Sequence, residues 1–149
     1  MNEQEKELLF IDLCGRLPYG VKCAEVYPNS KYINKWDILK IDKFSEDGIF
    51  ISNSEEIYGY VSRLENIKPY LFPLSSMTLE QRCKVQNLLS DKCVISFTNS
   101  KIEFYGEDYR DIKLEQLNKL FNLFNMWNID YRGLIPMGLA IDVTGKNIY

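Results

Sequence analysis

The chain has 149 residues, a length typical of one domain, and its 46% hydrophobic and 26% charged residues match globular proteins. Its 18 basic and 21 acidic residues give a formal net charge of −3, whereas nucleic-acid-binding proteins usually carry a net basic face. The chain contains no histidine, which removes the commonest metal ligand and the side chain most used for proton transfer near neutral pH.

The N-terminal segment does not resemble a targeting sequence. Residues 1–7 are polar and acidic, which excludes a secretory signal. The apolar run over residues 134–141 is much shorter than a membrane span. We therefore expect a cytoplasmic protein that does not enter a membrane.

A helix is predicted over residues 2–14, where leucine and isoleucine recur at three- and four-residue spacing. Gly15 is predicted to end this helix, because glycine readily adopts the conformation found after a helix C-terminus. Leu17-Pro18 then favours an extended or turn conformation.

Residues 19–70 are predicted to be β-rich. Short runs of β-branched and aromatic residues cover Val21–Tyr27, Asp37–Phe44, Ile49–Ser52 and Ile57–Val61, with turn residues between them. Asp47-Gly48 is the strongest hairpin signal. These runs predict an antiparallel meander, and a fifth strand over Leu64–Tyr70 would allow a small barrel of the Src-homology or Sm type.

Residues 68–74 contain two prolines and are predicted to form a rigid connector. Thr78 and Gln81 form a capping-box pattern, which predicts a helix at about residues 79–90. Residues 93–97 and 101–105 alternate around a turn and indicate a second hairpin, although a loop would also fit.

The strongest helical periodicity runs from Leu114 to Trp127, with Asp111 as the predicted N-cap. Its apolar stripe is predicted to be a buried core face, with a groove for a partner helix as the alternative. Leu123 and Met126 widen the stripe, so we expect contacts with more than one element. Residues 128–149 are rich in glycine and predicted to form turns, with a strand over Leu139–Val143.

Together these elements predict one α+β domain over residues 1–149, with a β-rich part at 19–70 and an α-rich part at 78–149. The predicted order is an N-terminal helix, an antiparallel β-meander or small β-barrel, and two helices flanking a short hairpin.

Known metal, phosphate and cofactor motifs are absent from the sequence. The four cysteines are separated by 9, 60 and 10 positions, unlike the close pairs of zinc sites, so buried free thiols are expected: Cys14, Cys23, Cys83 and Cys93. Gly145-Lys146 resembles the end of a phosphate-binding loop, but Ala140 and Asn147 break the motif. We expect no metal and no cofactor.

Two polar clusters are candidate sites. Asp130 and Arg132 flank a tyrosine before a glycine, and Arg16 precedes a proline-containing turn. The favoured interpretation is that these residues anchor loops. The alternatives are that an arginine presents its guanidinium to an anion, or that Asp130 and Arg132 serve a histidine-free enzyme.

A second set of candidates forms an acidic edge with tyrosines beside it. The predicted partner-binding residues are Glu46, Asp47, Glu55, Glu56, Tyr58 and Tyr60. Tyr58 and Tyr60 share one face of a predicted strand, so they point outward if the opposite face is core. The alternative is a sheet surface covered by a helix.

Three segments together resemble a known group of sequences: Leu13–Lys22, Lys68–Thr78, and Asp130–Ile135 with Gly138–Ala140. The resemblance is to a family of small uncharacterised proteins of Bacteroides-group bacteria, their phages and their prophages. It implies a cytoplasmic accessory protein of a mobile element, and it implies no catalytic residues.

The leading hypothesis is therefore a non-enzymatic protein that binds and inhibits or modulates a host protein, for example in an anti-defence role such as blocking a CRISPR nuclease. Its acidic edge would meet a basic nucleic-acid channel on that partner. The alternatives are a nucleic-acid-binding module, which would use the barrel and the basic stretch of residues 16–43, and the histidine-free enzyme.

Overall fold

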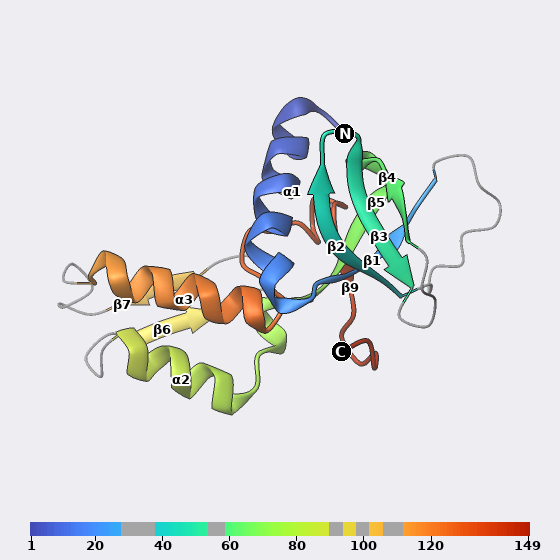
Figure 1. Cartoon of the computed structure of the whole chain (residues 1–149). Coiled ribbons are helices and arrows are strands. Elements are labelled where there is room, and N and C mark those ends of the chain that lie inside the picture. Colours follow the sequence, from blue (N-terminus) through green and yellow to red (C-terminus); the bar gives the residue numbers. More distant parts are fainter. Residues whose placement is uncertain (28–37, 54–58, 90–93, 98–101, 106–111) are drawn as a thin grey trace.

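The computed structural model describes residues 1–27, 38–53, 59–89, 94–97, 102–105 and 112–149. Within these residues the chain forms three α-helices, a seven-stranded mixed sheet and a separate two-stranded hairpin (Figure 1). This architecture confirms the predicted α+β class with an N-terminal helix first.

The N-terminal helix α1 spans Glu3–Arg16. Asn2 caps it: its side chain accepts a hydrogen bond from the backbone of Glu5, and the Glu5 carboxylate accepts one from the Asn2 backbone, both at 2.8 Å. These reciprocal bonds satisfy two backbone N–H groups that the helix start would otherwise leave unpaired.

The predicted end of this helix at Gly15 is wrong. The helix continues through Gly15 into a 3₁₀ turn, η1 (Leu17–Tyr19), and Gly20 ends it with a φ of 70°. A Cβ on Gly15 would lie 2.9 Å from Nδ2 of Asn125 on helix α3 (Leu114–Met126). Gly15 therefore serves the close approach of two helices, a requirement that local sequence does not reveal.

The predicted antiparallel meander is confirmed. Its strands are β1 (Lys22–Glu25), β2 (Leu39–Ser45), β3 (Gly48–Asn53) and β4 (Gly59–Ser62), each hydrogen-bonded to the next. The predicted turn at Asp47-Gly48 joins β2 and β3, where Ser45 pairs with Gly48.

Strand β5 (Ile67–Pro73) occupies the segment predicted to be a rigid connector, so that prediction is wrong. Strand β5 pairs antiparallel with β1 through residues 67–69, in parallel with β9 (Ile141–Asp142) through residues 70–71, and in parallel with β8 (Ile129–Asp130) through residues 72–73. The prolines are tolerated because Pro69 belongs to the last residue pair with β1 and Pro73 is the final residue of β5.

The barrel alternative is also wrong. The strand order β4-β3-β2-β1-β5-β8 describes an open path in which β4 and β5 are not hydrogen-bonded to each other. The 3₁₀ turn η2 (Leu64–Asn66) separates these two strands, and β4 is only four residues long. The fifth strand begins later than predicted because η2 takes up the first residues of that segment.

A second lobe contains helices α2 (Leu79–Leu89) and α3, with the hairpin β6 (Val94–Phe97) and β7 (Ile102–Tyr105) beside them (Figure 1). The predicted hairpin and both helices are confirmed. The capping box before α2 forms, with Thr78 N donating to Gln81 Oε1 at 2.9 Å and Gln81 N to Thr78 Oγ1 at 3.2 Å. The predicted N-cap of α3, Asp111, is wrong: it lies outside the described residues, and the N-cap position is held by Lys113, directly before Leu114.

Buried apolar residues form one cluster under α1 and another under α2 and α3. The first includes Leu9, Leu13, Ile51 and Leu71, and the second includes Val85, Leu120 and Phe124. The predicted buried stripe of α3 is only partly buried, since Leu114 is 73% exposed and Phe121 is 40% exposed.

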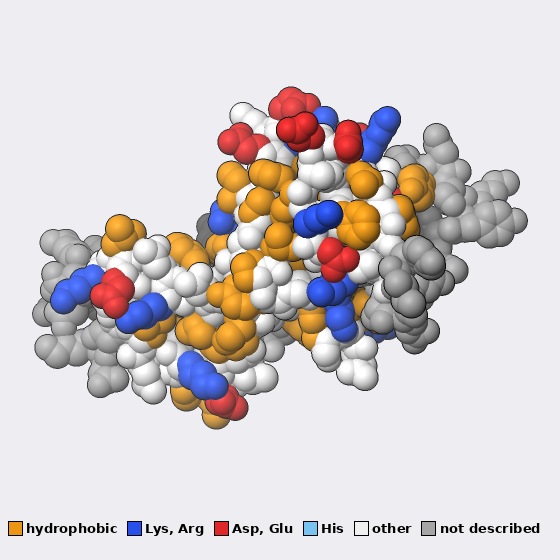
Figure 2. Space-filling view, viewed as in Figure 1, with side chains coloured by type: hydrophobic (Ala, Val, Ile, Leu, Met, Phe, Trp, Pro, Cys, Tyr) orange, Lys and Arg blue, Asp and Glu red, His pale blue; other side chains and the backbone are white. Residues whose placement is uncertain are grey.

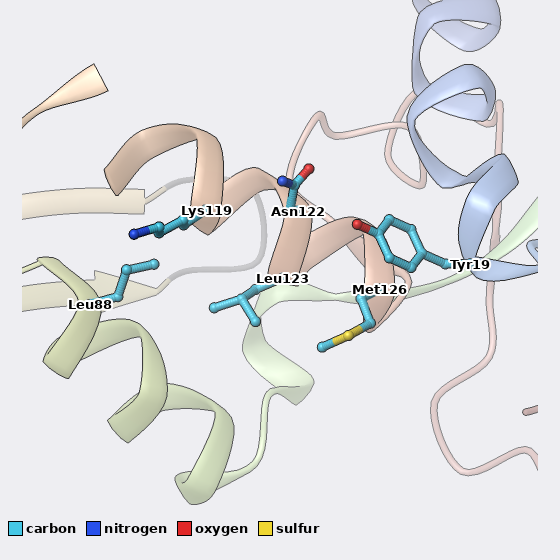
Figure 3. A pocket seen from close by; sticks show the side chains of 6 residues that line it. All are labelled: Tyr19, Leu88, Lys119, Asn122, Leu123 and Met126. Atoms are coloured by element: carbon cyan, nitrogen blue, oxygen red, sulfur yellow. The ribbon is translucent and has the colours of Figure 1, made fainter. Parts of the chain in front are cut away.

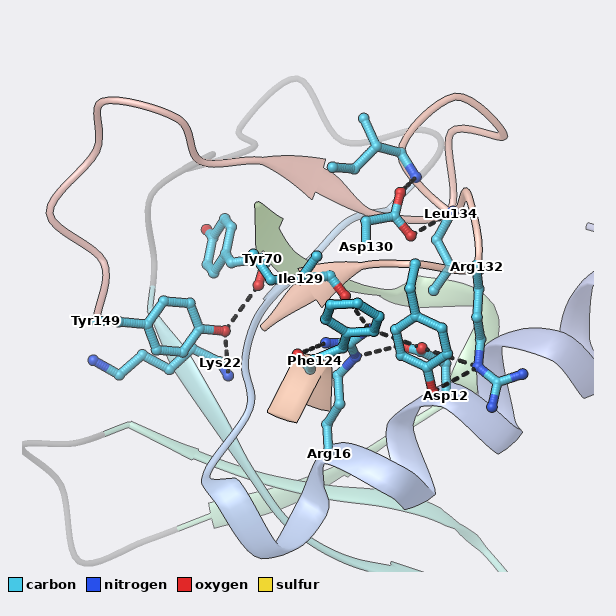
Figure 4. A network of polar contacts seen from close by, with 12 residues as sticks. Asp12, Arg16, Lys22, Tyr70, Phe124, Ile129, Asp130, Arg132, Leu134 and Tyr149 are labelled. Atoms are coloured by element: carbon cyan, nitrogen blue, oxygen red, sulfur yellow. Dashed lines mark hydrogen bonds and ion pairs between the residues drawn. The ribbon is translucent and has the colours of Figure 1, made fainter. Parts of the chain in front are cut away.

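The C-terminal segment lies across the face of β5 opposite α1. Tyr70 is buried there with Val143 and Ile148, and the hydroxyl of Tyr149 donates to the Tyr70 carbonyl at 2.8 Å (Figure 4). The segment is turn-rich as predicted, although its strand β9 is only two residues long. Among the described residues, no helix is both long and apolar enough to cross a membrane.

Candidate functional site

A buried ion pair joins α1 to the rest of the molecule. The side chains of Asp12 and Arg16 are both 0% exposed, and they lie one helical turn apart. Arg16 Nε and Nη2 donate to the two oxygens of Asp12, at 2.6 and 3.0 Å (Figure 4). This bidentate geometry is the strongest arrangement that a guanidinium and a carboxylate adopt.

Arg16 also binds the chain beyond its own helix. Its Nη2 donates to the Ile129 carbonyl at 2.9 Å, and its Nη1 donates to the Phe124 carbonyl in the last turn of α3 at 3.5 Å. A cation at a helix C-terminus interacts favourably with carbonyls that lack helical partners. The structure thus places Arg16 as an anchor between α1, α3 and β8, with its guanidinium inaccessible to an external anion.

Asp130 anchors the loop that follows β8. It is 1% exposed, and its two carboxylate oxygens accept hydrogen bonds from the backbone amides of Leu134 and Ile135, each at 2.8 Å. Because both oxygens are engaged by the backbone, this geometry agrees with the loop-anchoring interpretation.

Arg132 lies at the edge of the same network, partly open to solvent. Its Nε lies 3.4 Å from Oδ1 of Asp12 and donates to the Tyr131 hydroxyl at 3.2 Å. The guanidinium carbon is 5.0 Å from the centre of the Tyr131 ring, within cation–π range. The structure therefore brings Arg16, Asp130 and Arg132 into one region, as three residues with different surroundings.

The predicted acidic edge is described only in part. Glu46 and Asp47 are exposed in the β2–β3 turn, whereas Glu55, Glu56 and Tyr58 lie outside the described residues. Figure 2 shows acidic side chains gathered at the end of the molecule that holds the N-terminus of α1 and this turn.

Tyr60 is 48% exposed, and its hydroxyl donates to Glu25 at 2.6 Å. The Glu25 carboxylate also accepts hydrogen bonds from Tyr27, at 2.7 Å, and from Ser62. Desolvation and the bond to Glu25 raise the pKa of Tyr60, and the bond to Glu25 is the main cause that raises the pKa of Tyr27. This cluster joins the end of β1 to β4, a sheet-bridging role that the sequence did not reveal.

An apolar groove of about 340 Å³ opens between the two lobes. Figure 3 shows its walls, which come from three elements: Tyr19 of η1, Leu88 of α2, and Lys119, Asn122, Leu123 and Met126 of α3. Tyr19 is 39% exposed and Met126 is 45% exposed. In Figure 2, hydrophobic side chains gather on this face where α3 meets α1.

The sequence contained a signal for this groove. Leu123 and Met126 widen the apolar stripe of α3, which predicted contacts with more than one element. That prediction is confirmed, because α3 contacts α1, α2 and β8. Leu123 and Met126 line the groove, and Met126 remains exposed. The position of Tyr19 opposite them depends on how η1 leaves α1, which periodicity does not encode.

The prediction that the cysteines are buried free thiols is confirmed for one of them and wrong for two. Cys23 is buried, and burial raises its pKa to about 12, but Cys14 and Cys83 are exposed and Cys93 lies outside the described residues. Within the described part of the chain, no group of three or more Cys, Asp or Glu side chains could hold a metal ion.

Comparisons of the chain with protein-family models, with curated proteins and with solved structures found no match. Any functional assignment therefore depends on the chemistry and geometry of the residues themselves.

Proposed function

We propose that this protein acts by binding another protein, without catalysis, and that the groove between η1, α2 and α3 is the principal contact. The observation that carries the proposal is the exposure of Tyr19 and Met126 over the partly buried Leu88 and Leu123 in one concave surface. Docking of a partner on these side chains would remove their apolar surface from water, which favours association.

The groove is suited to the apolar face of a helix from the partner. It lies along α3 and is bounded on one side by α2, the arrangement in which a third helix can insert its side chains between two others. Burying one large apolar side chain contributes about 1.5–3 kcal/mol, so two or three such side chains support a specific interaction.

Two further observations support binding over catalysis. The nominated catalytic pair, Asp130 and Arg132, is engaged by backbone amides and by aromatic and acidic neighbours. The barrel required by the nucleic-acid alternative does not close, and Arg16, the first cation of its basic stretch, is fully buried.

The resemblance to mobile-element proteins extends the proposal to the kind of partner. We propose a host protein, in particular a nucleic-acid-processing defence protein with a basic surface. The exposed acids of the β2–β3 turn, Glu46 and Asp47, would steer association with such a surface and would contribute more to its rate than to its final affinity.

Site-specific photocrosslinking in host cells tests the groove. A photoreactive phenylalanine analogue at Met126 is expected to give a discrete adduct, whereas the same analogue at Leu114, on the same helix but outside the groove, gives none. With the partner then purified, Met126→Lys is expected to weaken binding at least about tenfold, since a charge would have to be buried.

Equal crosslinking from both positions, or unchanged affinity in Met126→Lys, would contradict the groove as the contact. The acidic contribution is tested separately by reversing Glu46 and Asp47, or Glu55 and Glu56, to lysine. These reversals are expected to slow association at low salt and to leave dissociation nearly unchanged.

A further inference from the structure

Arg132 differs from Asp12, Arg16 and Asp130 in that, among the described residues, its terminal nitrogens have no hydrogen-bond acceptor. Asp12 already receives two hydrogen bonds from Arg16, at 2.6 and 3.0 Å, and it meets only Nε of Arg132, at 3.4 Å. Among the described residues, none accepts a hydrogen bond from Nη1 or Nη2 of Arg132. Figure 4 shows both nitrogens turned away from Asp12.

The charge of Arg132 is correspondingly under-compensated. One buried carboxylate, Asp12, is shared between two guanidiniums, and the other carboxylate of the region, Asp130, is committed to backbone amides. The side chain of Arg132 is 32% exposed, so an anion can approach it without displacing any part of the fold.

The aromatic residues beside Arg132 hold it in place and add an apolar surface. The Tyr131 ring lies 5.0 Å from the Arg132 guanidinium and 5.5 Å from that of Arg16, and it stacks on Phe124 at 5.6 Å and on Phe121 at 5.3 Å. Phe121 is 40% exposed despite this stacking. A partly desolvated guanidinium held against a tyrosine ring, with the partly exposed Phe121 ring stacked on that same tyrosine, resembles the anchors found at binding hot spots.

We infer that Arg132, with Tyr131 and Phe121 as an apolar shelf, is a binding site for a carboxylate carried on an apolar group, as in an acidic side chain next to a hydrophobic residue of a protein ligand. The guanidinium fork of Nη1 and Nη2 matches the two oxygens of a carboxylate. A nucleic-acid phosphate is the less favoured ligand, because phosphate-backbone binding requires several cations and this region offers one accessible guanidinium.

This site is separate from the groove. Phe121 and Leu123 are two residues apart on α3, which places them about 200° apart around the helix axis. A partner bound in the groove therefore need not contact Arg132, and the inference does not depend on the proposed function.

The probe is 3-phenylpropionate, which carries one carboxylate and one phenyl ring. Titration into ¹⁵N-labelled protein is expected to shift the Arg132 Nε–Hε resonance and the Phe121 ring resonances. The neutral analogue 3-phenylpropanamide is expected to bind at least about fivefold more weakly, because it lacks the charge that pairs with the fork.

Three variants then distinguish the contributions of the Arg132 charge, of its two terminal nitrogens and of the Phe121 ring. Arg132→Gln is expected to abolish binding, Arg132→Lys to weaken it about fivefold because the fork is lost, and Phe121→Ala to weaken it by a smaller factor. Arg63→Gln, which removes an exposed arginine elsewhere, is the matched control and is expected to bind normally. Arg132→Gln leaves the Asp12–Arg16 pair intact, and its circular dichroism spectrum verifies its fold.

Three outcomes would overturn the inference. They are equal affinity for the acid and the amide, undiminished binding in Arg132→Gln, and tighter binding of inorganic phosphate than of 3-phenylpropionate at equal ionic strength. The last result would instead identify a phosphate site. None of these outcomes affects the Met126 crosslinking result, so failure of this site is distinguishable from failure of the groove.

Discussion

The buried network around Arg16 and the groove around Met126 both involve α3, yet the side chains of the two regions differ in their exposure to water. In the network, charged groups are withdrawn from water and receive partners: Asp12 and Arg16 are 0% exposed and bonded to each other. In the groove, apolar side chains remain in contact with water, with Met126 45% exposed. The contrast is between polar groups that the fold pairs in its interior and apolar groups that it leaves at the surface, where our proposal places the partner.

The largest effect is expected from breaking the network. Arg16→Ala would leave the Asp12 carboxylate buried without its main partner and remove the donors to the Ile129 and Phe124 carbonyls. The expected loss of unfolding free energy is about 3–5 kcal/mol, measured by urea denaturation. A loss below about 1 kcal/mol would show that the pair is not the anchor described above.

Asp130→Ala is expected to have the next largest effect. It removes the acceptor of two loop amides, one of them buried, and is expected to lower the unfolding free energy by about 2 kcal/mol. Asp142→Ala is the matched control, because Asp142 accepts bonds from Thr144 in an exposed turn and should lose about 0.5 kcal/mol or less. Equal losses of unfolding free energy in the two variants would contradict the idea that burial makes the Asp130 hydrogen bonds more stabilising than those of Asp142.

A third region, the apolar cluster under α1, contains Cys23 and is expected to make the stability of the fold depend on pH. Burial raises the pKa of Cys23 from 9.0 to about 12 in the folded protein. Below pH 9.0 the thiol is protonated in both states and its contribution to stability is complete; as the pH rises toward 12, only the unfolded chain releases the proton and that contribution is lost.

Between about pH 8 and 10 this group is expected to reduce the unfolding free energy by about 1.4 kcal/mol. Urea denaturation of the wild type and of Cys23→Ala at both pH values measures the difference, and the variant should show the smaller decrease. Identical decreases would indicate that the thiol ionises freely in the folded state.

The smallest effect on stability is expected in the groove. Met126→Ser should change the unfolding free energy by less than about 0.5 kcal/mol, because the residue is 45% exposed at an open surface, where its shortening leaves no enclosed cavity. Leu120→Ser is the control. Leu120 lies on the buried face of α3 and is 1% exposed, so this substitution should be strongly destabilising. A large loss in Met126→Ser would assign the groove to the folding core.

The predictions from sequence succeeded where a local pattern is sufficient. The capping box at Thr78 and Gln81 and the Asp47-Gly48 turn each involve residues close in the chain, and each formed as predicted. They failed where a distant element determines the outcome. Gly15 lies inside the helix, where its lack of a side chain allows Asn125 of α3 to come close, and residues 67–73 form a strand because β1, β8 and β9 supply their hydrogen-bond partners.

The candidate sites divide in the same way. Sequence alone nominated Arg16, Asp130 and Arg132 as residues that either anchor loops or bind an anion, and it determined the fold class and the absence of histidine chemistry. Only the tertiary structure showed that these residues have different surroundings, because their burial and hydrogen-bond partners depend on how distant segments pack. The Ile129 carbonyl that Arg16 binds, for example, lies more than 100 residues away in the chain. The same long-range packing decided that Tyr19 and Met126 would face one groove, since no local pattern fixes how η1, α2 and α3 meet.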